Sequence, residues 1–221
     1  MGNTDLANDE IRIASAPWKL TGSGYILLYR FTNAFVSEHG FLADFQKEKL
    51  VSGWGAVMLV DYQTSPVGPY QELLFIPGIF SFNKKKVFSI SKIYVSTQNS
   101  VINGIENWGI PKELAEFQWS KERTNEHIDI RKNGIPFFQA DFIRKSFCFP
   151  ISTAILPLTI VQASNRGLLE TKPTSSGIAY LTSLRNVKVK SEFFPDLSKV
   201  KPLLAIRVEN FKMEFPLPTL V

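Results

Sequence analysis

Residues 128–135 read Ile-Asp-Ile-Arg-Lys-Asn-Gly-Ile, and this stretch indicates most clearly how the chain folds. Apolar and polar residues alternate up to an Asn-Gly pair, which supplies the two positive-φ positions of a type I′ turn. The segment after the turn, 136–147, is rich in aromatic and β-branched residues, as strands require. The sequence therefore predicts an antiparallel β-hairpin with Asn133 and Gly134 at its tip.

The same kind of apolar segment, five to nine residues or longer and ended by Gly, Pro or Asn, recurs along the chain. Further strands are expected at 25–31, 54–61, 71–76, 87–95, 127–130, 178–184, 186–193 and 203–215. We expect the last of them to be bulged near Glu209 and Asn210. Open twisted sheets of about nine or more strands rarely persist, so these strands are expected to close into a barrel or sandwich.

Helical patterns are fewer. The best is 97–108, in which the apolar residues follow one helix face: Val101, Ile102, Ile105 and Trp108. Thr97 or Ser100 can cap its start, and Gly109 can close it in a left-handed conformation. A second helical pattern, at 35–50, is interrupted by a glycine. The fold class expected is α+β and strand-dominated, an antiparallel β-barrel or cone-like closed sheet with a few short helices.

Composition fits a folded protein of modest size. The chain has 221 residues, of which 44% are hydrophobic and 18 are phenylalanine, and we expect residues 1–221 to form a single domain. The net charge is +5, yet the only dense basic run, Lys84 to Lys86, is typical of a solvated turn between two strands. No nucleic-acid-binding motif accompanies it, so nucleic acid is not an expected partner.

The same features bear on location. The longest apolar runs fall short of the roughly 18 residues that a membrane-spanning helix needs, so no membrane association is expected. Residues 1–6 are polar and lack a secretory apolar region. The lone cysteine, Cys148, cannot form an internal disulfide and favours a reducing compartment, so a cytoplasmic location is expected. Because it lies between two phenylalanines, we interpret it as a buried, inert thiol.

Few residues suggest chemistry directly. His39 and His127 are far apart and lack cysteines or paired carboxylates at ligand spacing, so neither a metal site nor a cofactor is expected. One segment, 107–113, reads Asn-Trp-Gly-Ile-Pro-Lys-Glu. Its lysine, Lys112, has two readings: a solvated side chain, which is usual for lysine, or an amine held in an apolar pocket behind the helix that ends at Trp108.

A family resemblance favours the second reading. Residues 65–72, Ser-Pro-Val-Gly-Pro-Tyr-Gln-Glu, followed by 105–112, Ile-Glu-Asn-Trp-Gly-Ile-Pro-Lys, resemble the acetoacetate decarboxylase superfamily. Residues 16–25, 194–197 and 201–204 also resemble decarboxylase-like relatives, so the resemblance spans nearly the whole chain. It implies a compact β-barrel or cone, a homo-oligomer, and a small keto acid or another small apolar or carbonyl-bearing ligand as partner.

The resemblance also implies site residues. In the family, a lysine after this proline forms a Schiff base with the ketone of a β-keto acid, and Lys112 matches it. A glutamate two residues after a tyrosine lines the same pocket, which makes Glu72 the second catalytic candidate and Tyr70 a substrate-binding one. Trp108, Glu113 and Arg30 are the other candidate substrate-binding residues. Arg30 is included because it lies near the position of an arginine that the family has and this chain lacks; the alternative for it is a strand-face side chain paired with a surface acid.

Schiff-base chemistry needs a neutral amine. An amine with the ordinary lysine pKa of ~10.4 is almost entirely protonated at pH 7, and moving that pKa to ~7 corresponds to about 4 kcal/mol of bias against the ammonium. In the acetoacetate decarboxylases, neighbouring groups and burial activate the lysine in this way. We therefore expect apolar surroundings to lower the pKa of Lys112.

The sequence departs from the family pattern at three positions. Glu113 stands where the decarboxylase has a second lysine, Val57 where it has a second glutamate, and Gly22 where it has an arginine. These losses weaken decarboxylation more than imine formation. The leading hypothesis is a Schiff-base-forming lyase acting on a small β-keto or 2-keto acid. An aldolase- or dehydratase-like enzyme and a non-catalytic binding barrel are the alternatives, and a purely structural protein ranks last.

Overall fold

The computed structural model describes residues 11–155 and 158–221; residues 1–6, used above to argue against a leader, lie outside these ranges. Two helices form in the described part, α1 (Asn33–His39) and α2 (Gln98–Trp108), and neither is long and apolar enough to cross a membrane. The strands are β1 (Trp18–Arg30), β2 (Leu50–Ser52), β3 (Trp54–Thr64), β4 (Tyr70–Ile76), β5 (Ile79–Phe82), β6 (Lys85–Phe88), β7 (Lys92–Val95), β8 (Lys112–Leu114), β9 (Glu116–Glu122), β10 (Asn125–Lys132), β11 (Ile135–Ser152), β12 (Ile160–Ser164), β13 (Gly167–Thr171), β14 (Thr174–Val189), β15 (Leu204–Phe215) and β16 (Thr219–Leu220).

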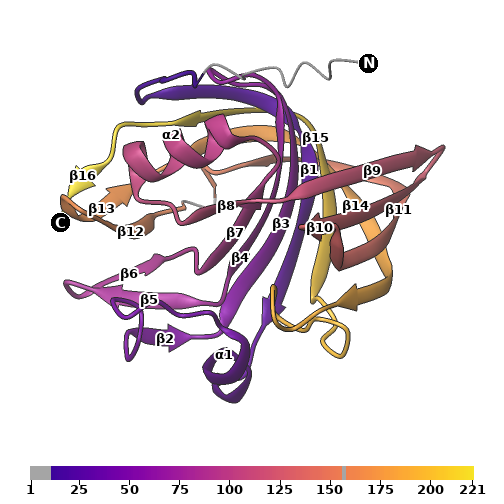
Figure 1. Cartoon of the computed structure of the whole chain (residues 1–221). Coiled ribbons are helices and arrows are strands. Elements are labelled where there is room, and N and C mark those ends of the chain that lie inside the picture. Colours follow the sequence, from indigo (N-terminus) through magenta and orange to yellow (C-terminus); the bar gives the residue numbers. More distant parts are fainter. Residues whose placement is uncertain (1–10, 156–157) are drawn as a thin grey trace, which may run out of the picture.

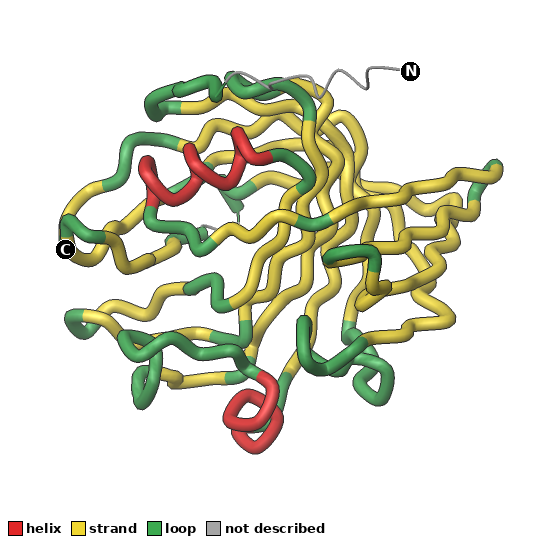
Figure 2. Tube along the Cα trace, viewed as in Figure 1, coloured by secondary structure: helices red, strands yellow, loops and turns green. Residues whose placement is uncertain are grey.

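Most strands join one ten-stranded sheet in the order β8-β7-β4-β3-β1-β15-β14-β11-β10-β9. The sheet curves until it is nearly closed, like a barrel (Figure 1). A six-stranded sheet, β16-β13-β12-β6-β5-β2, lies on the same side as α2. Strands dominate throughout, as Figure 2 shows. The expected strand-dominated, barrel-like fold with short helices is confirmed.

Both faces of the central strands are buried, because the side chains of a strand alternate between two faces. One, which we call the hairpin face, carries Tyr25, Leu27 and Tyr29 of β1 and packs against apolar residues of β10 and β11. The other, which we call the helix face, carries Trp18 and Leu20 of β1 and packs against residues that include Trp108 of α2. Neighbouring residues on one strand therefore lie in different surroundings.

The local turn and cap predictions are confirmed. Asn133 and Gly134 have φ of 53° and 74° and join β10 to β11 as a two-residue turn. Helix α2 begins after Thr97, whose side chain accepts a hydrogen bond from the Ser100 amide, and it ends at Gly109 with φ of 66°. The register of β15 against β1 shifts at the predicted bulge, where Asn210 has φ of 50°.

Two strand predictions are wrong in extent. Residues 87–95 form two strands, because β6 belongs to the small sheet and β7 to the large one. Between them the buried Ser89 hydroxyl donates a hydrogen bond to the Val161 carbonyl at 2.7 Å, which fixes the crossing. Conversely, 178–184 and the first half of 186–193 belong to one strand, β14. It pairs with β11 on both sides of the predicted break, with a shift in register at that point.

Cys148 is exposed, so the interpretation of a buried thiol is wrong. Strand β10 pairs with β11 only as far as Ile143, and β11 continues beyond it. There Cys148 has a partner on one side only, Tyr180 of β14. The two flanking phenylalanines gave no information on this, because the loss of the neighbouring strand is a property of the sheet and not of the local sequence.

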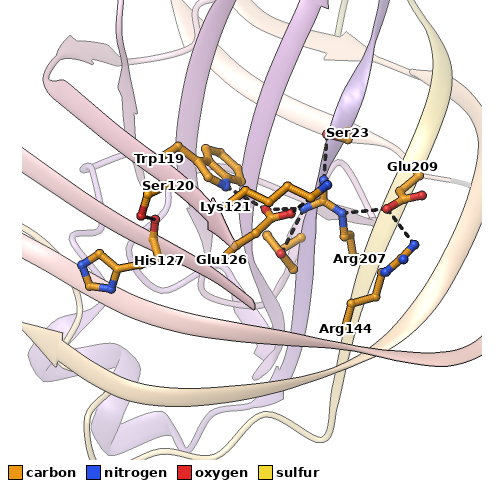
Figure 3. A network of polar contacts seen from close by, with 10 residues as sticks. Ser23, Trp119, Ser120, Lys121, Glu126, His127, Arg144, Arg207 and Glu209 are labelled. Atoms are coloured by element: carbon orange, nitrogen blue, oxygen red, sulfur yellow. Dashed lines mark hydrogen bonds and ion pairs between the residues drawn. The ribbon is translucent and has the colours of Figure 1, made fainter. Parts of the chain in front are cut away.

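A charged network on the hairpin face connects β15 with β9 and β10 (Figure 3). Arg207 of β15 pairs with Glu126 of β10, and it donates a hydrogen bond to the Tyr25 hydroxyl at 3.0 Å. Trp119 Nε1 donates to Glu126 at 2.8 Å. Burial opposes ionisation of Glu126, but these partners prevail and lower its pKa. The charges are thus satisfied inside the fold, and the network joins β1, β9, β10 and β15.

Helix α2 holds an N-terminal segment, residues 11–16, which we call the strap. Three asparagines one helical turn apart bind its backbone: Asn99, Asn103 and Asn107. Asn103 makes two such bonds, accepting from the Ala14 amide at 2.7 Å and donating to the Arg12 carbonyl at 2.7 Å. Four helical residues rise about 6 Å and two extended residues about 6.6 Å, so asparagines four residues apart on the helix match strap residues that are two apart. We call these three asparagines the asparagine ladder.

Replacing the central rung is expected to loosen the strap. Asn103→Ala leaves the Ala14 amide and the Arg12 carbonyl without their partner, which should cost about 1–3 kcal/mol of unfolding free energy. Urea denaturation measures the loss, and hydrogen exchange should show faster exchange at Ala14. Asn125→Ala, an exposed position on β10, is the control and should stay within about 0.5 kcal/mol of the unmodified protein. An equal loss of unfolding free energy in the two variants would contradict the proposal that Asn103 holds the strap.

Candidate active site

Lys112 is the first residue of β8, which lies directly after helix α2. Gly109 ends the helix, and a side chain there would lie 2.4 Å from the Ala163 carbonyl oxygen, so the left-handed turn requires glycine. After two more residues the chain enters β8, where Lys112 pairs with Ile93 of the parallel strand β7. The lysine is therefore placed at the edge strand of the large sheet and under the helix it follows.

The Lys112 amine is buried and has two close polar partners. Its side chain is 5% exposed. Nζ lies 2.9 Å from Glu72 Oε2 and donates a hydrogen bond to the Ser100 hydroxyl at 3.0 Å. It also lies 4.9 Å from the centre of the Tyr70 ring, within the range of a cation–π contact. The solvated reading of this lysine is thus excluded.

A glycine of α2 makes room for the lysine stem. A β-carbon on Gly104 would lie 2.6 Å from Lys112 Cδ and 2.8 Å from Cε. Gly104 is one helical turn after Ser100, so both residues face β8, and the missing side chain of the glycine leaves the space that the lysine stem fills. Helix α2 therefore contacts Lys112 twice, through a hydrogen bond at the amine and through close packing along the chain that carries it.

Glu72 is held on the helix face of β4. Its side chain is 5% exposed, and Oε1 accepts a hydrogen bond from the Tyr62 hydroxyl at 3.3 Å. The Tyr62 and Tyr70 rings lie 4.5 Å apart. Burial and the nearby carboxylate raise the pKa of Tyr62, and burial raises the pKa of Tyr70 to about 12, so both phenols are protonated at neutral pH.

The charge state of Lys112 differs from the expectation. Burial is the largest single influence, and it lowers the pKa of Lys112 as expected. The Glu72 carboxylate and Tyr70 act in the opposite direction, and together they hold the pKa above its ordinary value. At neutral pH Lys112 is therefore an ammonium ion paired with a carboxylate, and a neutral amine requires the proton to move.

The pair lies at the wall of a small apolar cavity of about 80 Å³. The polar side chains that line it are Tyr62, Tyr70, Glu72 and Lys112. The remaining lining is aliphatic or aromatic and comes from both sheets and α2: Trp18, Leu20, Met58, Val60, Leu74, Ile76, Ile90, Ile93, Trp108, Ile110, Leu158, Ile160, Pro173, Met213 and Phe215. A water needs roughly 10–15 Å³ of such space, so the cavity accommodates a handful of non-hydrogen atoms beside the amine.

Backbone carbonyls hold the two tryptophans of this wall, and one of these carbonyls belongs to the strap. Trp18 Nε1 donates a hydrogen bond to the Ala14 carbonyl at 3.0 Å, and Trp108 Nε1 donates to the Pro216 carbonyl at 2.7 Å. Each indole N–H thus points to backbone, and the apolar rings are left to line the cavity. The two rings meet edge to face at 5.1 Å.

Four of the six residues expected at the site come together there: Lys112, Glu72, Tyr70 and Trp108. Glu113 does not, because the next residue on a strand faces the other way. It lies beside Tyr94 on the hairpin face, where it pairs with Lys92 and Lys132. The structure therefore places Glu113 outside the cavity that Lys112 lines.

Arg30 also lies elsewhere. It is exposed at the end of β1, with its guanidinium 5.4 Å from the centre of the Trp54 ring. Val57, which stands where the family has a second glutamate, also lies away from the cavity, because it is fully buried on the hairpin face. Among the described residues that line the cavity, Glu72 is the one carboxylate and Lys112 the one cation.

Sequence reasoning missed three residues of the site. Ser100 was considered only as a helix cap, a role that Thr97 fills. Tyr62 and Gly104 were not singled out. Tyr62 pairs with Tyr70 across β3 and β4, so the sheet register would have found it. For Gly104 the available signal was a glycine inside a helical pattern, which often marks close packing.

Comparison with known proteins gives a family profile that matches part of the chain. Residues 47–150, which include Glu72, Ser100 and Lys112, match the profile of the family described as acetoacetate decarboxylase (ADC). No curated protein sequence matches the chain.

Solved structures extend the likeness over the whole chain. An acetoacetate decarboxylase from Legionella pneumophila is 14% identical with a TM-score of 0.72, covering 94% of this chain and 88% of its own. The enduracididine biosynthesis enzyme MppR, in complex with pyruvate, is 12% identical with a TM-score of 0.67, covering 96% and 93%. An acetoacetate decarboxylase-like enzyme from Sphingomonas wittichii is 10% identical with a TM-score of 0.66, covering 95% and 94%. The profile match and the shared fold agree: residues 47–150 are similar in sequence to the acetoacetate decarboxylase family, and nearly the whole chain has the same fold as the solved acetoacetate decarboxylases.

Proposed function

We propose that this protein is a Schiff-base-forming lyase that acts on a small keto acid through Lys112. The observation that carries the proposal is the buried contact of 2.9 Å between the Lys112 amine and Glu72 at the wall of an apolar cavity. The decarboxylase-type superfamily supports a lyase reaction of this class.

The reaction begins with a proton transfer within the pair. Glu72 takes one proton from the Lys112 ammonium, which leaves a neutral amine and a neutral acid in apolar surroundings that favour uncharged groups. The amine attacks the substrate carbonyl and forms a carbinolamine. Glu72 returns its proton to the departing hydroxyl, which leaves as water, and the Lys112 nitrogen becomes part of an iminium ion.

The iminium accepts the electron pair of the bond that breaks. In a β-keto acid that bond joins the α-carbon to the carboxylate, so carbon dioxide leaves and an enamine remains. Protonation of the enamine at carbon and addition of water then release the ketone and the free lysine. A carboxylate held in this cavity is poorly solvated and lies near Glu72, which favours its loss. Ser100 and Tyr62 hold the amine and the acid in position.

Two alternatives share the same lysine. An aldol-type or dehydrating reaction would proceed from the same iminium, and the complex of MppR with a condensation product of pyruvate and an aldehyde supports that class. A non-catalytic binding barrel is supported by the raised pKa of Lys112, because a stable ion pair is a poor nucleophile. Analysis of the reaction products distinguishes an aldol-type or dehydrating reaction from decarboxylation. Imine trapping distinguishes an enzyme that uses Lys112 from a non-catalytic binding barrel. The proposal includes a cytoplasmic homo-oligomer.

Borohydride trapping tests the imine directly. Reduction in the presence of acetoacetate or pyruvate should fix an adduct on the peptide that contains Lys112, identified by mass spectrometry. Lys112→Arg keeps the positive charge beside Glu72 but cannot form an imine, so its adduct should be absent. Lys92→Arg, on the neighbouring strand and the opposite face, is the control and should leave the adduct unchanged. A folded protein that forms no Lys112 adduct with any of several keto acids would overturn the proposal.

The pH dependence should report the ion pair. Because the Lys112 pKa is raised, the ammonium persists to a higher pH, and modification by a small acylating reagent should keep increasing above pH 10. Glu72→Gln removes the charge that raises this pKa while burial remains, so the modification profile should move to lower pH. Imine formation with acetoacetate should nevertheless slow, by about 100-fold, because the proton carrier is lost. Faster imine formation in Glu72→Gln would show that Glu72 only restrains the amine. Glu122→Gln, on β9, is the control.

Filling the gap at Gly104 should displace the lysine without unfolding the helix. In Gly104→Ala the new methyl group would lie within 3 Å of two Lys112 carbons. Alanine is favoured over glycine in a helix by up to about 1 kcal/mol, so stability should change little. Trapping of the imine should slow by about 100-fold, as for other small misplacements of a reacting group. Glu106→Ala, an exposed position on the same helix, should trap at the normal rate; equal rates in both variants would contradict the packing role.

A further inference from the structure

A Schiff-base reaction at Lys112 needs one more proton donor than the ion pair provides. When the enamine takes up a proton at carbon, the Lys112 nitrogen is part of the substrate, and Glu72 has already given its proton to the departing hydroxyl. Four side chains of the described cavity lining can exchange a proton: Lys112, Glu72, Tyr62 and Tyr70. The two tyrosines are therefore the remaining donors on the cavity wall.

Tyr62 is engaged with Glu72. Its hydroxyl donates to Glu72 Oε1 at 3.3 Å, so its proton is directed at the carboxylate. Burial and the nearby carboxylate raise the pKa of Tyr62 well above its ordinary value, because a phenolate there would be poorly solvated and would face a second negative charge. Tyr62 is thus suited to holding Glu72 and is a poor proton donor to the substrate.

Tyr70 has different neighbours. It lies two residues before Glu72 on β4, so both side chains are on the same face of the strand. Burial raises the pKa of Tyr70, whereas the Lys112 ammonium and the Ser100 hydroxyl, which act on it as donors, lower it, so that it settles at about 12. Because an ammonium can donate but not accept, its contact with Tyr70 leaves the phenolic proton free.

The position of Tyr70 also suits a transfer to carbon. The α-carbon of an enamine on Lys112 is two bonds from the nitrogen, roughly 2.5 Å away. A proton donor acts on it from about 2.6–3.2 Å, so the donor must lie within about 5–6 Å of Nζ. The centre of the Tyr70 ring is 4.9 Å from Nζ, and the side chain lines the cavity in which the substrate would lie.

We propose that Tyr70 is a catalytic residue that protonates the enamine at its α-carbon. The O–H bond of Tyr70 breaks, a C–H bond forms at the α-carbon, and the enamine becomes an iminium ion again. Water then adds to the iminium with Glu72 as the base, and one proton from solvent restores the phenol. That proton is the one that decarboxylation of a keto acid anion consumes overall. This inference rests on the proposed function and assigns its last proton transfer.

The charges produced by this step balance within the cavity. The phenolate forms at the moment when the neighbouring enamine nitrogen becomes positive, so each ion has an opposite charge beside it. The Ser100 hydroxyl stays close to the phenolate as a donor. The lysine that loses its positive charge in the first step therefore supplies one again, as an iminium, when Tyr70 needs it.

Hydrogen exchange of a ketone tests the step in reverse. Acetone forms an iminium ion on Lys112, the Tyr70 phenolate removes a methyl proton, and in heavy water the return step places deuterium on carbon. Nuclear magnetic resonance measures the exchange, and borohydride trapping of acetone measures the imine separately. Tyr70→Phe keeps the ring beside Lys112 and removes only the hydroxyl, so trapping should stay within about threefold. Exchange should slow by at least about 100-fold, because the acid–base group is lost.

Two other tyrosines serve as comparisons. Tyr62→Phe removes the hydrogen bond to Glu72, so trapping and exchange should slow together and their ratio should not change. Tyr180→Phe, at a half-buried position of β14 beside Arg144, lies outside the cavity lining and should leave both rates unchanged. A fall in the ratio of exchange to trapping that is confined to Tyr70→Phe is the result expected.

The two measurements separate this inference from the proposed function. Exchange in Tyr70→Phe that keeps pace with trapping would overturn the role of Tyr70 and leave the Schiff base intact, since solvent would then protonate the carbon. Trapping of acetone by the unmodified protein without any exchange would also overturn it. Loss of trapping with every ketone and keto acid would overturn the proposed function, and the role of Tyr70 with it.

Discussion

The ion pair between Lys112 and Glu72 places the strictest demand on this fold. Each charge alone would be costly in an apolar interior, and removing one partner of such a pair leaves the other uncompensated. The pair persists because β4, β8 and α2 each contribute a group: the carboxylate, the amine and the Ser100 hydroxyl. The large sheet fixes the first two, and the helix fixes the third and leaves room for the lysine stem at Gly104. The same contacts that stabilise the ammonium also oppose the loss of its proton, so the proposed reaction must begin by moving that proton to Glu72.

The two faces of the large sheet keep other charges away from that proton. Glu113 follows Lys112 directly and would favour the ammonium if it shared the cavity, yet the strand turns it to the hairpin face, where two lysines neutralise it. Burial raises the pKa of that carboxyl, but the lysines prevail and lower it, so Glu113 stays ionised. The buried network around Arg207 also lies on the hairpin face. The cavity therefore experiences one acid and one base, although the chain carries many more of each.

Local features of the fold could be predicted from the sequence, and features that depend on distant strands could not. The Asn133-Gly134 turn and the caps at Thr97 and Gly109 follow from a few neighbouring residues, whose backbone preferences decide the structure. The placement of Lys112 and Glu72 in one site came from the family pattern, since forty residues separate them in the sequence. Tyr62, Ser100 and the exposure of Cys148 depend on strand register and on where a neighbouring strand stops. The direction in which the Lys112 pKa shifts depends on the distance of 2.9 Å between its amine and the Glu72 carboxylate, which no sequence pattern supplies.

The asparagine ladder has a consequence for how relatives are compared. The asparagines bind the strap through backbone amide and carbonyl groups, which every residue except proline offers in full. The exposed side chains at 11–13 and 15 are therefore free to change during evolution while the attachment persists, whereas Ala14 and Ala16 pack against the helix face. An alignment would then show a variable strap sequence together with three asparagines, each four residues apart, in the helix that corresponds to α2. Those asparagines, and not the strap itself, are the mark by which homologues with the same attachment should be sought.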